Sequence, residues 1–182
     1  MSLDNPAPSP LESQAMEAYR QGHLDEAAQG FAAARQAYSE AGDAAKAAEM
    51  ANDLSVTLLR CGRPHQALDA VRGTERFFDE LGDRTRAAQA YGNLASALEA
   101  CGDAVDAEQA YRQAVELFEE TGDPENRART LTAVSQLQLR RGRPLEAIMN
   151  MQSALERQPR LNWRKRLLRW LLHLPSKLQG GA

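Results

Sequence analysis

The chain contains 182 residues, of which 43% are hydrophobic, 26% are charged and only 5% are aromatic, with a formal net charge of −3. This length fits one domain or one short repeat array, whose core must consist largely of Ala and Leu. Two cysteines exclude a disulfide-stapled scaffold, and no run of about 18 uncharged apolar residues is present that could span a bilayer.

The two ends of the sequence differ in character. The N-terminal MSLDNPAPSP lacks the basic and apolar regions of a secretory signal, so we expect an intracellular, cytoplasmic protein. Seven basic and no acidic residues lie between Arg157 and the C-terminus, which leaves the first 156 residues with 15 basic and 25 acidic residues. An acidic body with a basic end predicts a separate electrostatic task for that end. Arg greatly outnumbers Lys, which we interpret as the mark of a GC-rich, bacterial genome.

Glycines recur at a constant interval, at positions 22, 42, 62, 82, 102, 122 and 142. Alternate glycines have similar surroundings: Gly22, Gly62, Gly102 and Gly142 are each followed five residues later by Ala, and the glycines between them are followed directly by Asp. The true repeat therefore spans two of these intervals, or about 40 residues. Gly just past a helix end and Asp just before a helix are favoured at such boundaries, so we expect one helix in each interval between glycines.

The expected helices begin at Ser9, where Ser9-Pro-Leu-Glu12 has the pattern of a capping box. Within the later intervals the apolar residues have helical spacing, and no segment alternates with period two. Small residues at fixed offsets predict close approach of paired helices; they are Ala27, Ala67, Ala107, Ala147, Ala34, Thr74, Ala114 and Ala154.

This pattern resembles the tetratricopeptide repeat in its 40-residue, long-helix variety, over about residues 11–158 and in four units. The resemblance implies an all-α fold, a right-handed α-solenoid of four helix-turn-helix repeats, to which we add a C-terminal amphipathic helix. The predicted organisation is a disordered tail over 1–8, the solenoid over 9–158, the basic amphipathic helix over 159–174 and a disordered tail over 175–182. The sequence departs from the family in having no Trp early in the first helix of each unit.

Residues suited to catalysis or metal binding are not grouped in the sequence. The three histidines, 23, 65 and 173, have no second His or paired carboxylate at metal-ligand spacing, and GxSxG, P-loop and GxGxxG motifs are absent. We therefore predict a protein that is not an enzyme, with no catalytic residues, no metal and no cofactor. Cys61 and Cys101 lie one repeat apart, about 8–10 Å, which is too far for a disulfide, so we expect both to be reduced.

The resemblance further implies that the first helix of each unit lines a concave groove that holds an extended peptide or a helix. Side chains expected to project into the groove are partly apolar and partly Arg, which would complement a partner segment with acidic residues. An alternative is that Leu59 and Leu139 pack against their own second helices. The predicted partner-binding residues are Met16, Tyr19, Arg20, Asn52, Val56, Leu59, Arg60, Asn93, Ser96, Glu99, Gln136, Leu139 and Arg140.

Two neighbouring residues of the predicted groove are open to different interpretations. Asn93 is similar to the Asn with which family members hold a peptide backbone, and a role in helix packing explains it equally well. Gly92 inside a helix costs about 1 kcal/mol relative to Ala, which predicts close approach by another group, in the first place a neighbouring helix. The chaperone-tail-binding subclass of the family uses Lys and Asn in the groove. Lys46 is the only Lys in the array, so that subclass is not supported.

Residues 161–174 form a second feature, with polar side chains on one helical arc and apolar ones over most of the remainder. At about 21 Å this helix is too short to span a bilayer. It would cap the last repeat, lie on an anionic membrane surface, or dock on a membrane protein or another protein. Nucleic acid is disfavoured because the body is acidic. The predicted docking residues are Trp163, Arg164, Lys165, Arg166, Leu167, Arg169, Trp170, Leu171 and Leu174.

The sequence thus predicts a non-catalytic adaptor or scaffold that holds a protein partner in its groove. Its terminal helix would place it at the cytoplasmic membrane face, as an assembly factor or subunit of a membrane-associated complex. The alternative is a soluble scaffold that self-associates through the same helix and buries Trp163 and Trp170 between copies.

Overall fold

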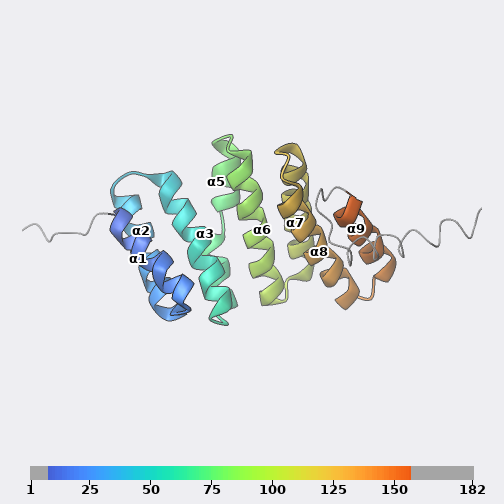
Figure 1. Cartoon of the computed structure of the whole chain (residues 1–182), viewed down its shortest axis with the longest axis horizontal. Coiled ribbons are helices and arrows are strands. Elements are labelled where there is room, and N and C mark those ends of the chain that lie inside the picture. The colour runs from blue at the N-terminus through green and yellow to red at the C-terminus, as the bar shows by residue number, and fades with distance from the viewer. Residues whose placement is uncertain (1–7, 157–182) are drawn as a thin grey trace, which may run out of the picture. The chain divides into compact units, whose positions relative to one another are not determined.

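The computed structural model describes residues 8–156, and all regular secondary structure in this range is α-helical (Figure 1). The helices are α1 (Pro8–Gln21), α2 (Leu24–Glu40), α3 (Ala44–Arg60), α4 (Pro64–Val71), α5 (Thr74–Glu80), α6 (Arg84–Cys101), α7 (Ala104–Glu120), α8 (Pro124–Arg140) and α9 (Pro144–Glu156). The predicted all-α helical-repeat fold is confirmed. The predicted C-terminal helix over 159–174, with all its docking residues, lies outside the described residues, as do most residues of the two predicted tails.

The evenly spaced glycines end helices as expected. All seven adopt the left-handed backbone conformation, with φ between +69° and +91°. The aspartates that follow three of these glycines cap the next helix. The side chains of Asp43, Asp83 and Asp123 each accept a hydrogen bond from the backbone N–H three residues later, at 3.0 Å. Because both kinds of boundary depend on local geometry alone, the sequence pattern located them correctly.

The expected helix between Gly62 and Gly82 is broken into α4 and α5 at Gly73, which has a φ of +93°. The Thr74 hydroxyl donates to the carbonyl oxygen of Val71 at 2.8 Å, and the Gly73 N–H donates to the Glu75 carboxylate at 2.8 Å. These two hydrogen bonds satisfy backbone groups that the break leaves without helical partners. The second repeat therefore contains a bent second helix.

The start of α1 differs from the expectation. The helix begins at Pro8, so Ser9 lies inside its first turn, where its carbonyl oxygen accepts from the Ser13 hydroxyl at 3.0 Å. The Glu12 carboxylate binds Tyr38 and Lys46 in neighbouring helices. The predicted capping box is therefore wrong, because long-range partners engage Glu12.

The described helices belong to two compact units, residues up to 110 and residues from 111 onward, and α7 crosses the boundary. In the first unit α1 packs on α2, α2 on α3, α3 on α4, and both α4 and α5 on α6; α3 also contacts α6 (Figure 1). In the second unit α8 packs on α9, and Val115 of α7 packs against Ala128, Leu131 and Ala154. None of the helices within residues 8–156 combines the length and apolarity needed to cross a bilayer.

Small residues allow these helices to approach closely, as the sequence pattern predicted. The seven alanines and one threonine that stand five or twelve residues after alternate glycines are all buried. Gly30 of α2 shows the closest approach, because a Cβ atom added there would lie 2.7 Å from the Cβ of Ala15 in α1. Larger side chains such as Phe31 and Phe78 fill the remaining space and are 1% exposed. The core is therefore a close-packed lattice of Ala with a few aromatic rings.

Candidate partner-binding groove

Two recesses lie along the first helices of the repeats in the N-terminal unit. The α1–α3 recess has a volume of about 80 Å³ and is lined by Met16, Tyr19, Phe31, Asp53, Val56 and Thr57. The α3–α6 recess has a volume of about 310 Å³ and is lined by Glu49, Asn52, Asp53, Phe78, Arg86, Gln89 and Asn93. Asp53 contributes to both, so α3 separates two adjoining hollows that differ in polarity.

The structure brings several of the predicted groove residues together. Met16, Tyr19 and Val56 meet in the α1–α3 recess, and Asn52 and Asn93 meet in the α3–α6 recess. Outside the recesses, Leu59, Ser96 and Glu99 are half-buried while Arg20 and Arg60 are exposed. Partner binding by these residues stays a prediction, because co-location alone tests only their placement.

The three remaining predicted residues, Gln136, Leu139 and Arg140, lie on α8 in the C-terminal unit and are exposed. They do not line the recess described next, which lies in the same unit and has a volume of about 270 Å³. Its lining residues are Arg112, Val115, Glu116, Leu131, Val134, Gln138, Glu146, Met149 and Asn150. There the Asn150 amide donates to the Gln138 side-chain oxygen at 2.8 Å, which satisfies a glutamine that is 1% exposed.

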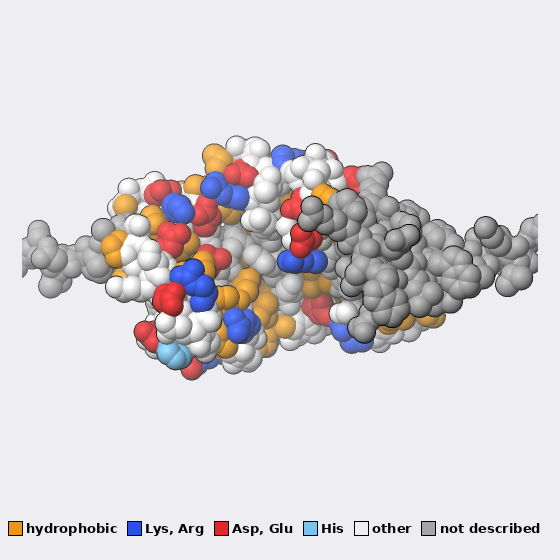
Figure 2. Space-filling view, in the orientation of Figure 1, with side chains coloured by type: hydrophobic (Ala, Val, Ile, Leu, Met, Phe, Trp, Pro, Cys, Tyr) orange, Lys and Arg blue, Asp and Glu red, His pale blue; other side chains and the backbone are white. Residues whose placement is uncertain are grey.

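Two of the predicted groove arginines, Arg20 and Arg60, have contacts within the N-terminal unit. Arg20 forms an ion pair with Glu17 at 2.6 Å. The Arg60 guanidinium lies over the ring of Tyr19, 4.6 Å from its centroid, and forms no ion pair within residues 8–156. Stacking on the ring fixes the cation while its N–H groups stay available, so Arg60 is the better placed of the two to meet an acidic group. Figure 2 shows Lys/Arg and Asp/Glu side chains interspersed over this unit, with apolar areas among them.

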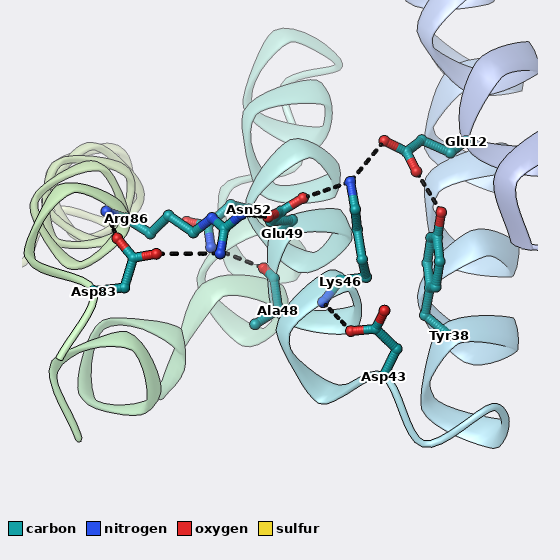
Figure 3. A network of polar contacts seen from close by, with 9 residues as sticks. All are labelled: Glu12, Tyr38, Asp43, Lys46, Ala48, Glu49, Asn52, Asp83 and Arg86. Carbon is teal, nitrogen blue, oxygen red and sulfur yellow. Dashed lines mark hydrogen bonds and ion pairs between the residues drawn. The ribbon is translucent and has the colours of Figure 1, made fainter. Parts of the chain in front are cut away.

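A chain of polar contacts connects four helices beside the recesses (Figure 3). The Tyr38 hydroxyl of α2 donates to Glu12 of α1 at 2.5 Å, and Lys46 of α3 lies 3.4 Å from Glu12 and 2.9 Å from Glu49. Arg86 of α6 then contacts Glu49 at 2.7 Å. Both cations therefore bridge helices that belong to successive repeats.

Contacts within this network of polar side chains raise the pKa of two of its residues, Tyr38 and Lys46. The hydrogen bond to the Glu12 carboxylate raises the pKa of Tyr38, with burial adding to the effect. The contact with Glu49 raises the pKa of Lys46, against the opposing effect of burial. Arg86 is additionally held by Asp83, at 3.1 Å, and lies 5.9 Å from the centroid of the Phe78 ring. Lys46 and Arg86 are thus each already paired with two carboxylates.

The surroundings of Asn93 and Gly92 test the predictions that the sequence made for these two residues. The Asn93 amide donates to the Asn52 side-chain oxygen at 3.0 Å, and Asn52 in turn donates to the Ala48 carbonyl at 2.9 Å, which supports the helix-packing role. A Cβ at Gly92 would meet no heavy atom of residues 8–156 within 4 Å. The prediction that a neighbouring helix closely approaches Gly92 is therefore wrong, because no described helix comes within 4 Å of a Cβ at this position.

Asp53 is the residue that sequence reasoning missed. The pKa of its carboxyl is raised to about 6, chiefly by burial and in addition by the charges of Glu12 and Glu49, while Lys46 opposes them. Within residues 8–156 no group hydrogen-bonds to, or pairs with, this carboxylate. The repeat register could have revealed it, because Asp53 stands nine residues before Gly62 as Asn93 stands nine before Gly102.

The two cysteines are free and half-buried, in agreement with the predicted reduced state. The Cys101 sulfur lies 3.6 Å from Nδ1 of His65. Burial raises the pKa of the Cys101 thiol, which disfavours the thiolate needed for nucleophilic chemistry. Across residues 8–156, His, Cys, Asp and Glu side chains form no group of three or more that could hold a metal ion.

Comparison with solved structures places the chain among helical-repeat proteins. BtubC (BKLC) from P. vanneervenii superposes with a TM-score of 0.74 at 18% identity, covering 96% of this chain and 65% of its own. The apo form of RapI gives 0.76 at 12% identity, covering 98% and 51%. The putative kinesin light chain TPR-like repeats of Podosopora anserina give 0.74 at 16% identity, covering 94% and 89%. The chain thus spans less than two thirds of the length of the first two.

The family model of the tetratricopeptide repeat matches residues 86–160. This match places tetratricopeptide repeats in residues 86–160, and the described helices before residue 86 share the same helical-repeat fold. No curated relative matches the sequence. The tetratricopeptide-repeat fold supports a role as an adaptor or scaffold in protein–protein interaction.

Proposed function

We propose that this protein is a non-catalytic adaptor that holds a segment of a protein partner along α1, α3 and α6 of its N-terminal unit. The observation that carries the proposal is the arrangement around Tyr19. Its ring supports the exposed Arg60 guanidinium and also lines the recess shared with Met16 and Val56. An apolar hollow beside a fixed cation can accept an apolar side chain and a neighbouring carboxylate at the same time.

The partner segment is therefore amphipathic and contains acidic residues. Arg60 is the cation best placed to meet one of them, because Arg20 is paired with Glu17. Leu59, half-buried on the same helix, extends the apolar contact.

The test uses a displayed library of random peptides selected on the whole chain. Affinity for the selected peptides is then measured on a Leu59→Ala, Arg60→Ala double variant. We expect a loss of about tenfold or more, corresponding to about 1.4 kcal/mol. A matched control is Arg35→Ala with Leu81→Ala, which removes one exposed Arg and one exposed Leu from outside the recesses. If both double variants bind the selected peptides with equal affinity, the groove is not the binding site.

Residues 159–174 are the basis of a second part of the proposal, that the protein lies at the cytoplasmic face of an anionic membrane. The sequence supports it through Trp163 and Trp170, which are flanked by five cations between Arg160 and Arg169. Aromatic rings at headgroup depth and cations on anionic lipid stabilise interfacial helices. This placement suits an assembly factor or subunit of a membrane-associated complex.

Both tryptophans of the chain lie in this segment, so their fluorescence reports on it directly. We expect a blue shift on addition of phosphatidylserine-containing vesicles, partly reversed at high salt because screening weakens surface charge interactions. No shift at low salt would remove the membrane from the proposal. Light scattering tests the alternative: a self-associating scaffold would become monomeric on truncation after Gln158.

A further inference from the structure

The Asp53 carboxylate lies where the two recesses of the N-terminal unit adjoin. Its own backbone carbonyl accepts from the Thr57 hydroxyl at 2.7 Å, but its side chain has no partner within residues 8–156. Asp53 is half-buried, and carboxylates that are partly removed from water are ordinarily paired or hydrogen-bonded, since burial without a partner is costly. The position of Asp53 therefore needs a physical explanation.

Charged groups from three helices face this carboxylate and do not neutralise it. Glu12 of α1 and Glu49 of α3 repel it, and Lys46 of α3, between these two glutamates, attracts it only weakly. Arg86 of α6 lines the same recess but is held by Glu49 and Asp83 (Figure 3). Each nearby cation is thus engaged by two other carboxylates, and the surroundings of Asp53 carry an excess of negative charge.

The α3–α6 recess supplies groups that suit a cationic side chain. Gln89 and Asn93 contribute amide groups, beside the Asn52 amide that is already hydrogen-bonded, and Phe78 contributes an aromatic ring to the lining. Amide oxygens accept hydrogen bonds from ammonium or guanidinium groups. A metal ion is a poor occupant by comparison, because no set of three potential ligands is grouped in the described part of the chain.

We propose that Asp53 receives a lysine or arginine side chain of the partner segment that the groove holds. This inference rests on the proposed function and adds the charge pattern of the partner. A cation bound there would pair with Asp53 and form a charge-assisted hydrogen bond where the chain itself offers none.

The register along α3 specifies the partner further. Asp53, Val56 and Arg60 are spaced i, i+3 and i+7, which places them on one face of the helix with about 10.5 Å of axial rise between the first and last. The matching segment therefore has a basic residue and an acidic residue separated by about the same distance, with an apolar side chain between them that enters the α1–α3 recess.

The experiment compares peptide selections on the whole chain and on three variants of it. The native chain should enrich peptides with Lys or Arg at one fixed position, and Asp53→Lys should enrich Asp or Glu at that position. Asp106→Asn, which removes an exposed carboxylate on α7 outside both recesses, should select the same peptides as the native chain. Asp53→Asn should bind a peptide selected on the native chain about tenfold more weakly.

A second readout is the pH dependence of binding of one such peptide. Affinity for the native chain should fall below about pH 6, where Asp53 becomes protonated, while affinity for Asp53→Asn should not change over that range. Circular dichroism confirms that each variant is folded, and Asp53→Asn decides the question if Asp53→Lys does not fold.

The two levels of the proposal fail in different ways. Selected peptides that need Leu59 and Arg60 but show no basic preference, or that bind Asp53→Asn unchanged, overturn the inference and leave the groove intact. If the affinity of the selected peptides changes neither in Asp53→Asn nor in the Leu59→Ala, Arg60→Ala double variant, both the inference and the proposed groove are overturned.

Discussion

Asn93 of α6 donates its side-chain amide to the side-chain oxygen of Asn52 in α3 at 3.0 Å, across 41 residues of sequence. Asn52 is 9% exposed and donates its own amide to the Ala48 carbonyl, so its hydrogen-bonding capacity is largely satisfied. The bond therefore connects the first helices of two successive repeats within the lining of the α3–α6 recess.

We predict that a double-mutant cycle on this pair shows a coupling free energy of about 1 kcal/mol in urea unfolding, the usual net value of a neutral hydrogen bond. The cycle uses Asn93→Ala, Asn52→Ala and the double variant. Gln89→Ala is the control partner for Asn52→Ala, since Gln89 lines the same recess without a hydrogen bond to Asn52. Additivity of the Asn93 and Asn52 effects would show that the bond contributes nothing to stability.

Asp53→Asn should stabilise the native state at high pH and have little effect at low pH. The carboxyl pKa rises from 3.8 to about 6 on folding, so the native state disfavours the ionised form. The associated stability is fully present below pH 3.8 and is lost as the pH rises through about 6. The variant avoids this loss, and its free energy of unfolding at pH 8 should exceed that of the native chain by about 1–3 kcal/mol.

Chemical unfolding at pH 4 and at pH 8 measures this difference. Asp106→Asn is the control, because it makes the same chemical change at an exposed carboxylate. A difference between Asp53→Asn and the native chain that is the same at both pH values would contradict the raised pKa.

Ser55→Ala should raise the free energy of unfolding by about 1 kcal/mol, because a buried hydroxyl without a hydrogen-bond partner carries a desolvation cost. Ser55 is completely buried and its oxygen has no partner among the described residues. Ser135, at the same position two repeats later, is equally buried but donates to the Leu131 carbonyl at 2.8 Å. Thermal unfolding should therefore show a higher midpoint for Ser55→Ala and no gain for Ser135→Ala.

Gly73→Ala should destabilise the protein by about 1–2 kcal/mol, because its φ of +93° is strained for any residue with a Cβ atom. Urea unfolding measures the change. An unchanged midpoint would show that α4 and α5 can join into one helix at no cost, as the sequence alone led us to expect.

Gly92→Ala should have the opposite sign and stabilise the protein by about 0.5–1 kcal/mol in the same measurement. Gly92 lies inside α6, where Ala is the better helix former, and an added Cβ would touch no atom of the described part of the chain. A loss of stability would mean that α6 is more closely covered than this structure shows.

Much of the fold could be predicted from local signals. The evenly spaced glycines and the aspartates that follow three of them specify helix ends through backbone conformation and N-capping, which need no information from distant residues. The periodic small residues predicted the close helix pairs, and Ala27 and Ala34 are indeed fully buried. The break at Gly73 was not predicted, because the register of the repeat is continuous through it.

The candidate site was predictable only in part. The repeat register and the family resemblance predicted five residues that do line the recesses: Met16, Tyr19 and Val56 the α1–α3 recess, and Asn52 and Asn93 the α3–α6 recess. The groove arginines were predicted from the repeat register alone, which does not show what each one contacts. The structure shows that Arg20 is already paired with Glu17.

The sequence by itself determined the helical repeats, their boundaries and their small-residue core, because these depend on backbone conformation and on spacing within a single repeat. Only the tertiary structure decided which charges are engaged and which are not. Lys46 and Arg86 have local partners three residues away, Glu49 and Asp83, and they become bridges only because Glu12 and Glu49 come within reach from other helices. Asp53 is left without a partner among the described residues for the same reason: electrostatic pairing depends on distance in space, which the spacing of letters does not encode.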